Sequence, residues 1–409
     1  MLVRPFRALR PRPETAEAVV APPYDVVDTD EARALADGKP ASFLHISRPE
    51  IDLPPGTDQY SDAVYARGAQ NLAALIKQDV LEREATPCYY IYRLTMGKHS
   101  QTGIAAAASV VAYDEQRIHR HEFTRPDKED DRVRNIESLN AQTGPVLLAY
   151  RANAAVDDRL AAHSAGAPLF EVVGQHDVVH TIWRVDDPAA VTELTNAIDA
   201  LGDLYIADGH HRSAAASRVA ASRRKSGTPA DASHEFFLSV AYPDDQMQVF
   251  DYNRAVRDLN GLSAKEFLAA VSKAFAIEAV GSQARPAAPN SFGMYLDGQW
   301  YSLVVDASNV ADDPLARLDV SLLQDRLINT MLGVTDPRTD SRIAFIGGVR
   351  GLDELERRVD SGRDAVAFAL YPTGMRDMMA VADAGLVMPP KSTWFEPKLA
   401  DGLLSHVLD

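Results

Sequence analysis

The sequence predicts an α+β (mixed α/β) fold in which helices pack on mixed sheets. Two observations lead to this class: β-rich runs alternate with amphipathic helical stretches along the chain, and no internal repeat of fixed period is present. A surface loop at 281–290, rich in alanine and proline, indicates a seam nearby. We therefore expect two α/β regions, residues 1–262 and residues 263–409.

The expected elements follow from hydrophobic periodicity. Apolar residues repeat at helical spacing in eight stretches: 58–84, 127–140, 188–201, 213–225, 263–275, 319–332, 352–360 and 375–384. Short β-rich runs bounded by Gly, Pro and polar residues predict strands at 43–47, 88–95, 103–113, 145–150, 170–173, 178–185, 204–207, 236–242, 248–252, 291–296, 300–305, 343–346 and 365–371. Frequent prolines in residues 1–56 disfavour long helices there.

Composition and charge restrict the kinds of partner. The 409 residues are 46% hydrophobic and 24% charged, which is typical of a folded protein. A net charge of −16 repels polyphosphate backbones, so nucleic acid is a poor partner. The single cysteine, Cys88, stands in an apolar strand-like run and is expected to be an inert core thiol. Because no apolar run is long enough for a membrane span, we expect a cytoplasmic protein without a membrane partner, and a homo-oligomer stays open.

The strongest candidate site is the Asp-Gly-His-His-Arg segment at 208–212, between an expected strand and an expected helix. A helix start presents unpaired N–H groups and a partial positive charge, which favours an anion. Gly209 permits a tight turn and close approach of a ligand, and Arg212 suits a phosphate. His210 and His211 can donate hydrogen bonds or move protons, and Asp208 can bind Mg²⁺ or act as a base. The alternative is structural, with Asp208 capping the helix.

The second candidate is the densely charged loop at 118–132. Glu122 offers a carboxylate for base or metal chemistry, and Arg132 offers a cation for phosphate. His119 and His121 alternate, which leaves a zinc site open, although zinc would need further ligands from the segment at 208–211. A solvated surface loop is the other alternative.

Two further groups of residues stand beside prolines. Near the C-terminus, Lys391 and Lys398 lie in a proline-rich segment that could clamp a phosphorylated ligand or serve as a packed strap. Near the N-terminus, Tyr24, His45 and Arg48 could line a substrate pocket. The common nucleotide, hydrolase and metalloprotease motifs are absent from the sequence.

Four blocks of residues resemble the bacterial and archaeal family catalogued as domain of unknown function 1015. In chain order they are Ala21-Pro-Pro-Tyr-Asp-Val26, His121-Glu122 with Asp131-Arg132 downstream, Ala207-Asp-Gly-His-His-Arg212, and Met388-Pro-Pro-Lys-Ser-Thr-Trp-Phe-Glu-Pro-Lys398. They span nearly the whole chain. The third block is also similar, over one short motif, to the Gly-x-x-Arg phosphate-binding turn of the superfamily that contains ParB partition proteins, sulfiredoxin and free-serine kinases.

This resemblance implies phosphotransfer to free L-serine, with pyrophosphate or a nucleotide as donor and Mg²⁺ as cofactor. Asp208 or Glu122 would then activate the serine hydroxyl. The donor would be held by Gly209, His210, His211, Arg212, Arg132, Lys391 and Lys398, and the amino acid by Tyr24 and Arg48. Two alternatives stay open: a non-catalytic sensor of a phosphate or nucleotide ligand that binds a partner, and a metal-dependent phosphate-ester hydrolase.

Overall fold

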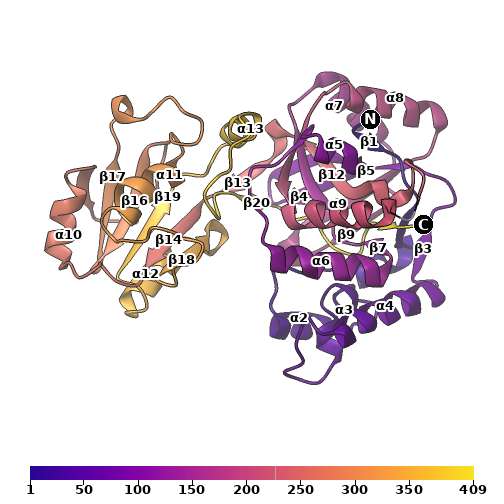
Figure 1. The fold of residues 1–409 in the computed structure, drawn as a ribbon, viewed down its shortest axis with the longest axis horizontal. Helices are drawn as coiled ribbons and strands as arrows, with labels where there is room; N and C mark the ends of the chain where they lie inside the picture. The colour runs from indigo at the N-terminus through magenta and orange to yellow at the C-terminus, as the bar shows by residue number, and fades with distance from the viewer. Residues whose placement is uncertain (226) are drawn as a thin grey trace. The chain divides into compact units, whose positions relative to one another are not determined.

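The computed structural model describes residues 1–225 and 227–409 and has a mixed α+β architecture, which confirms the predicted fold class (Figure 1). The chain forms two compact units. The first contains Met1–Met247 together with Pro397–Asp409, and the second contains Gln248–Glu396. The boundary expected between residues 262 and 263 falls inside the second unit. The end of the chain returns to the first unit.

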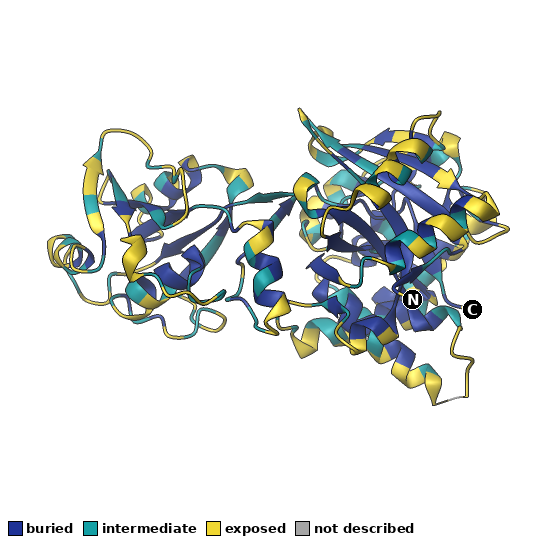
Figure 2. Ribbon diagram, turned by 90° about the horizontal axis from the view of Figure 1, so that it is seen from above, coloured by how far each residue is buried: buried dark blue, intermediate teal, exposed yellow. Residues whose placement is uncertain are grey.

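A mixed sheet that contains nine strands within the described residues is the centre of the first unit. Its order is β6-β11-β8-β12-β5-β4-β10-β9, and β1 pairs with β5. The bounds are β1 Val3–Arg4, β4 Tyr89–Met96, β5 His99–Ser109, β6 Ile118–His119, β8 Val146–Tyr150, β9 Phe170–Val173, β10 Val179–Val185, β11 Leu204–Asp208 and β12 Phe236–Pro243. The inner strands are buried on both faces, as the dark blue arrows in Figure 2 show, so their sequences are continuously apolar rather than alternating.

Helices of the first unit contribute to separate apolar clusters. Leu160 of α7 and Leu194 of α8 pack on the large sheet, whereas Phe43 and Leu72 belong to a cluster formed largely by the N-terminal helices. The helices are α1 Ala16–Val19, α2 Thr29–Ala36, α3 Leu44–Ser47, α4 Asp62–Lys77, α5 Val110–Asp114, α6 Pro126–Leu139, α7 Ala154–His163, α8 Pro188–Asp199 and α9 His210–Arg224. A smaller sheet of order β3-β2-β21-β7 joins β2 Ala8–Pro11, β3 Leu81–Arg83, β7 Ala141–Gln142 and β21 Ser405–Val407.

The second unit has its own sheet, of order β15-β17-β16-β19-β14-β18. The strands are β14 Tyr252–Val256, β15 Ala276–Val280, β16 Ser291–Leu296, β17 Gln299–Val304, β18 Ile343–Gly347 and β19 Val366–Leu370. The helices are α10 Ala264–Val271, α11 Asp319–Leu323, α12 Asp353–Asp360 and α13 Met375–Asp383. At the ends of this unit, β13 Gln248–Phe250 pairs in antiparallel fashion with β20 Trp394–Glu396.

Most expected elements are present with shifted ends, but several expectations are wrong. The strand expected at 43–47 is instead the helix α3, which begins at Leu44 after Phe43 as its N-cap, because a short buried apolar run does not by itself distinguish a strand from a helical turn. The strand expected to reach residue 113 ends at Ser109, whose hydroxyl accepts from the Ala112 N–H and caps α5. The single helix expected at 319–332 is α11 followed by π-helical residues 324–329.

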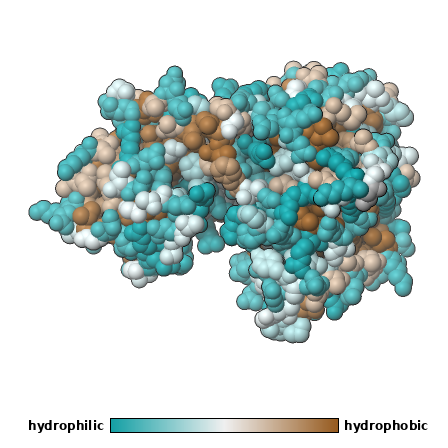
Figure 3. All heavy atoms as spheres, viewed as in Figure 1, coloured by the Kyte–Doolittle hydropathy of each residue, from teal (hydrophilic) through white to brown (hydrophobic). Residues whose placement is uncertain are grey.

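The residues in the core and on the surface are those expected from the composition of a folded protein. Cys88 is buried, as expected, and its thiol donates to the Tyr90 hydroxyl at 3.2 Å. Hydrophilic residues cover much of the face drawn in Figure 3, with smaller apolar patches between them. Among the described residues, the structure has no helix that combines the length and apolarity required to cross a membrane.

Candidate functional site

The site is built at the junction between β11 and α9. Gly209 connects the two elements with a φ of 98°, in the left-handed region that favours glycine. A Cβ at this position would lie 3.1 Å from Nε of Arg212 and 3.3 Å from Cα of Val146. The helix begins at His210, so part of the segment expected to be a turn is already helical. The first N–H groups of α9 are therefore presented where β11 ends.

Asp208 lies at the end of β11 between two cations. Its Oδ2 atom is 3.3 Å from Nζ of Lys398 and 3.7 Å from Nη2 of Arg212, and its Oδ1 atom accepts from the Gly209 N–H at 2.9 Å. Burial opposes the charged form, but Lys398 and Arg212 outweigh it and hold the pKa of Asp208 well below its ordinary value. The cap position of α9 is Gly209. The helix-cap alternative for Asp208 is therefore wrong.

Arg212 connects three segments of the first unit. Its side chain is buried, and its guanidinium donates to the Pro145 carbonyl and lies 3.8 Å from a carboxylate oxygen of Asp25. Burial disfavours the cation, but Asp25 and Asp208 raise the pKa of Arg212 above its ordinary value. This permanent cation faces two partly exposed carboxylates, with the Asp25 side chain 40% and the Asp208 side chain 34% exposed.

A pair of histidines lies beside this cluster. The rings of His121 and His210 meet edge to face with their centroids 4.6 Å apart, and the backbone N–H of His121 donates to Nε2 of His210 at 3.5 Å. Burial lowers the pKa of both, that of His121 to about 4. Nδ1 of His210 is 4.0 Å from Oε2 of Glu122. His210 is thus a neutral imidazole at neutral pH, and Nδ1 carries its proton, because Nε2 accepts.

The neighbouring residues of the two candidate segments are also brought together. Nε2 of His211 accepts from the Arg125 N–H at 3.1 Å, which ties the charged loop to α9. Arg132 stacks over the ring of Tyr24 at 3.8 Å and pairs with Asp131 at 2.7 Å. Burial raises the pKa of Tyr24 to about 12, although Arg132 opposes it. Tyr24 is therefore a neutral, aromatic support for the guanidinium.

A pocket of about 430 Å³, part of it open to solvent, lies behind Arg212. Tyr24 and Arg132, both predicted site residues, line it as well. The other lining residues are Ser47, Asn135, Ile136, Gln142, Thr143, Gly144, Val146, Phe237, Leu238 and Asp401. Sequence reasoning missed Asp401, although the Asp-Gly pair at 401–402, three residues after Lys398, was a detectable signal.

Three predicted site residues belong neither to the cluster at the start of α9 nor to the residues that line this pocket. His45 uses both ring nitrogens elsewhere, with Nδ1 2.7 Å from Asp52 and Nε2 3.2 Å from the Lys39 carbonyl. Arg48 pairs with Glu50 at 2.9 Å. Lys391 belongs to the second unit. Roles in substrate or phosphate binding for these three stay predictions.

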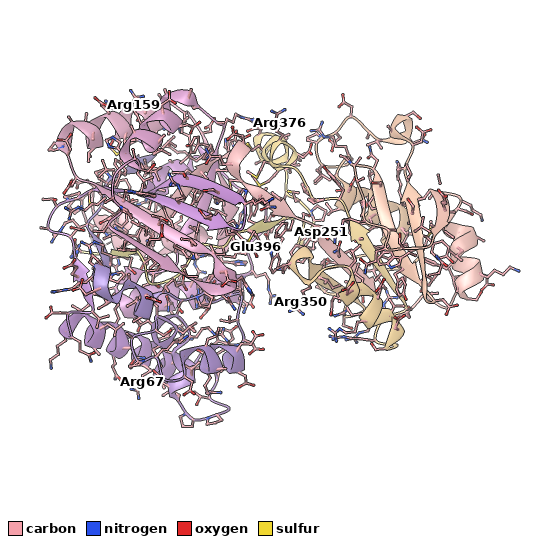
Figure 4. All side chains as sticks on the ribbon, turned by 180° about the vertical axis from the view of Figure 1, so that it is seen from behind. Arg67, Arg159, Asp251, Arg350, Arg376 and Glu396 are labelled. Carbon is pink, nitrogen blue, oxygen red and sulfur yellow. The ribbon has the colours of Figure 1, made fainter. Side chains whose placement is uncertain are left out.

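The pair of glycines at 347–348 has a packing explanation in the second unit. A Cβ on Gly347 would lie 3.0 Å from the ring of Trp394, and one on Gly348 would lie 2.2 Å from a carboxylate oxygen of Asp251, which is labelled in Figure 4. These neighbours fill the space that a side chain would need.

The side chains of the candidate site determine which of the expected metal ions, zinc or magnesium, it could bind. Within 1–225 and 227–409, no group of three or more His, Cys, Asp and Glu side chains is arranged to hold a metal ion. His119 instead stacks on Tyr205 and lies 3.6 Å from Asp203, so the zinc alternative has no ligand set. Mg²⁺ is commonly held by one or two carboxylates together with the phosphates of a substrate. A role of the Asp208 and Glu122 carboxylates in such shared binding stays a prediction.

Comparison with protein families identifies the class. A family model described as "Protein of unknown function (DUF1015)" matches residues 3–321, most of the chain. The protein therefore belongs to this family, as the sequence blocks predicted. The search of curated proteins found no match.

Solved structures with distant similarity include the following three. "Free serine kinase in complex with AMP" has a TM-score of 0.35 at 12% identity, over 71% of this chain and 86% of that one. A "conserved hypothetical protein from Pyrococcus furiosus" has a TM-score of 0.34 at 12% identity, over 76% and 97%. SbnI from Staphylococcus aureus, truncated at its C-terminus, has a TM-score of 0.39 at 12% identity, over 73% and 85%. Similarities this low carry no argument about function.

Proposed function

We propose that the protein transfers a phosphoryl group to a small hydroxyl metabolite, with L-serine as the acceptor and pyrophosphate or a nucleotide as the donor. The observation that carries this proposal is the cluster at the start of α9, where Lys398 and Arg212 flank the ionised Asp208. Catalysis of phosphoryl transfer depends on positioning and on neutralising the charge of the transferred group. Two fixed cations and a helix start next to one carboxylate supply both.

The roles follow from the charges. The serine oxygen attacks the terminal phosphorus of the donor, and its proton passes to a carboxylate. The bond between that phosphorus and the bridging oxygen breaks. Phosphate leaves when pyrophosphate is the donor, a nucleoside diphosphate when the donor is a triphosphate, and a nucleoside monophosphate when the donor is a diphosphate. Lys398, Arg212 and the N–H groups of His210 and His211 stabilise the negative charge on the oxygens.

Glu122 is the better general base of the two carboxylates. A base works best when its pKa lies near the working pH, and the cations around Asp208 depress its pKa far below that. The Glu122 side chain is 38% exposed, and its Oε2 atom lies 4.0 Å from Nδ1 of neutral His210. Asp208 then serves to hold the cations in place and to bind Mg²⁺, which would neutralise the phosphates of the donor.

Phosphorus NMR of the purified full chain tests the proposal. L-serine and Mg²⁺ are incubated with pyrophosphate, ATP or ADP in separate samples. O-phosphoserine in one of them would support the proposal and identify the donor. Pyrophosphate hydrolysis without phosphoserine would favour the hydrolase, and ligand binding without turnover would favour the sensor. Either of these outcomes would contradict a serine kinase.

Substitutions of the two carboxylates separate their roles. We expect Glu122→Gln to lower kcat by about 100-fold or more, because the proton acceptor is lost. Asp208→Asn should also reduce turnover, but with a raised KM for the donor, since Lys398 and Arg212 lose their common partner. Glu193→Gln, at an exposed position on α8, is the control and should leave both constants unchanged. Normal turnover in Glu122→Gln would remove Glu122 as the base.

A further inference from the structure

Asp401 is a buried carboxylate in the wall of the pocket. It is 2% exposed, and its backbone pairs with Ala21 through two hydrogen bonds of 2.9 and 3.2 Å, so its position is fixed. Oδ2 accepts from the Tyr24 N–H at 3.2 Å. Oδ1 has no hydrogen-bond partner within the part of the chain that the structure describes. One oxygen of this buried carboxylate, in a residue that lines the pocket, therefore has no hydrogen-bond donor.

Leaving a buried carboxylate oxygen without a hydrogen-bond donor costs free energy. Buried polar atoms in folded proteins are nearly always hydrogen-bonded, and a ligand, water or a proton can complete them. Burial raises the pKa of Asp401 to about 7, with Asp25 adding to the effect and Arg212 and Arg132 opposing it. A cationic donor in the pocket would restore the ionised carboxylate.

Positively charged side chains line the same pocket. Arg132 and Arg212 both line it, and both side chains are largely buried, at 12% and 10% exposure. Buried guanidinium groups attract a carboxylate or a phosphate. The pocket thus offers one group that needs a donor and two that attract an anion.

We propose that Asp401 binds the ammonium group of an α-amino acid in this pocket while the arginine pair holds its carboxylate. The inference deepens the proposed function and rests on it for the identity of this amino acid as the acceptor. An ionised carboxylate only accepts hydrogen bonds, so the ligand group that meets Oδ1 must donate, and an ammonium group supplies both donors and charge. An acid that carries hydrogen in place of the α-amino group would leave Asp401 unpaired and would be rejected. Asp401 is then the residue that selects an α-amino acid over the acid that lacks the amino group.

Calorimetric titration of the full chain with L-alanine and with propanoate tests this. L-alanine keeps the ammonium and carboxylate groups of an amino acid but has no hydroxyl to be phosphorylated, and propanoate lacks the ammonium. We expect L-alanine to bind the wild-type chain at least about tenfold more tightly than propanoate. Asp401→Asn should remove most of this preference. The matched control is Asp319→Asn, which also changes a buried carboxylate with one unpartnered oxygen, but in the second unit.

Three results would overturn the inference: no binding of L-alanine, equal binding of the two ligands by the wild type, or an unchanged preference in Asp401→Asn. The comparison of ligands in the wild type needs no substitution, so it stands even if a variant unfolds. Because L-alanine cannot be phosphorylated, its binding is independent of turnover. Binding without kinase activity would contradict the proposed function and leave the role of Asp401 in place.

Discussion

At the scale of single residues, the site combines conformations and ionisation states that are unfavourable elsewhere. Gly209 holds a left-handed backbone, His121 and His210 are neutral in the interior, and Asp401 keeps an oxygen without a donor. Strain and perturbed pKa values gather at functional sites because surrounding packing enforces them. Each feature has a measurable consequence for stability.

Replacing Gly209 by alanine should destabilise the protein for two reasons. The left-handed φ costs about 1 to 2 kcal/mol for a residue with a Cβ. The new methyl would also press on the backbone of Val146 and on Arg212, at an added cost of about 1 kcal/mol or more. Gly202→Ala is the control, since Gly202 has a φ of 85° but no atom within 4 Å of the place that a methyl group would occupy. Urea unfolding should show the larger loss for Gly209→Ala, and equal losses would mean that the close packing has no energetic weight.

The neutral His121 makes stability depend on pH. Its pKa is about 4 in the folded chain and about 6.5 when unfolded, so between these values only the unfolded state binds the proton. Stability from this group is present above the unfolded pKa and is lost as the pH falls toward 4. Relative to His121→Gln, the wild type should lose about 2 kcal/mol of unfolding free energy between about pH 7 and about pH 5. A constant difference between the two proteins across this range would show that His121 is accessible to protons.

At the scale of elements, local sequence patterns predict many of the helices and strands. They do not predict that the end of the chain returns to the first unit. The strand and helix around residues 204–224 were predictable because an apolar run, a glycine and an alanine-rich stretch follow one another. Lys398 was chosen as a phosphate ligand from its sequence block, and the structure places it beside Asp208. Asp401 was missed because its burial depends on packing of the C-terminal segment against Ala21 and Tyr24, which no local pattern encodes.

The C-terminal segment depends on β21 for its position. Leu408, which follows this strand, is fully buried in a cluster with Ile136 and Val219. Leu408→Ala should cost about 2 to 5 kcal/mol and should also weaken ligand binding in the pocket, because Asp401 loses its anchor. Leu160→Ala, which truncates an equally buried leucine on α7, should cost as much stability and leave binding intact. Equal effects of both variants on L-alanine binding would show that β21 has no special role in holding the segment.

At the scale of the whole molecule, the second unit is an insertion between two parts of the first. Gln248 in β13 is paired with Glu396 in β20, so the chain leaves and re-enters the first unit through two neighbouring strands. Paired residues of antiparallel strands lie about 5 Å apart, a distance that a short turn can span. Every residue of the pocket wall, and both ion-pair partners of Asp208, belong to the first unit.

The second unit can be replaced by a short Gly-Asn linker between Met247 and Pro397. This shortened chain should therefore fold and bind L-alanine with the affinity of the full protein. Within the part of the chain that the structure describes, the clusters that contain Leu160 and Phe43 draw no residue from 248–396, so the cooperative unfolding of the first unit should be retained. A chain that stops at Met247 is the control. It lacks β21, Lys398 and Asp401, and we expect it to be unstable and unable to bind. Calorimetric unfolding and titration of both chains measure these outcomes, and a joined chain that folds but does not bind would show that the second unit contributes directly to the site.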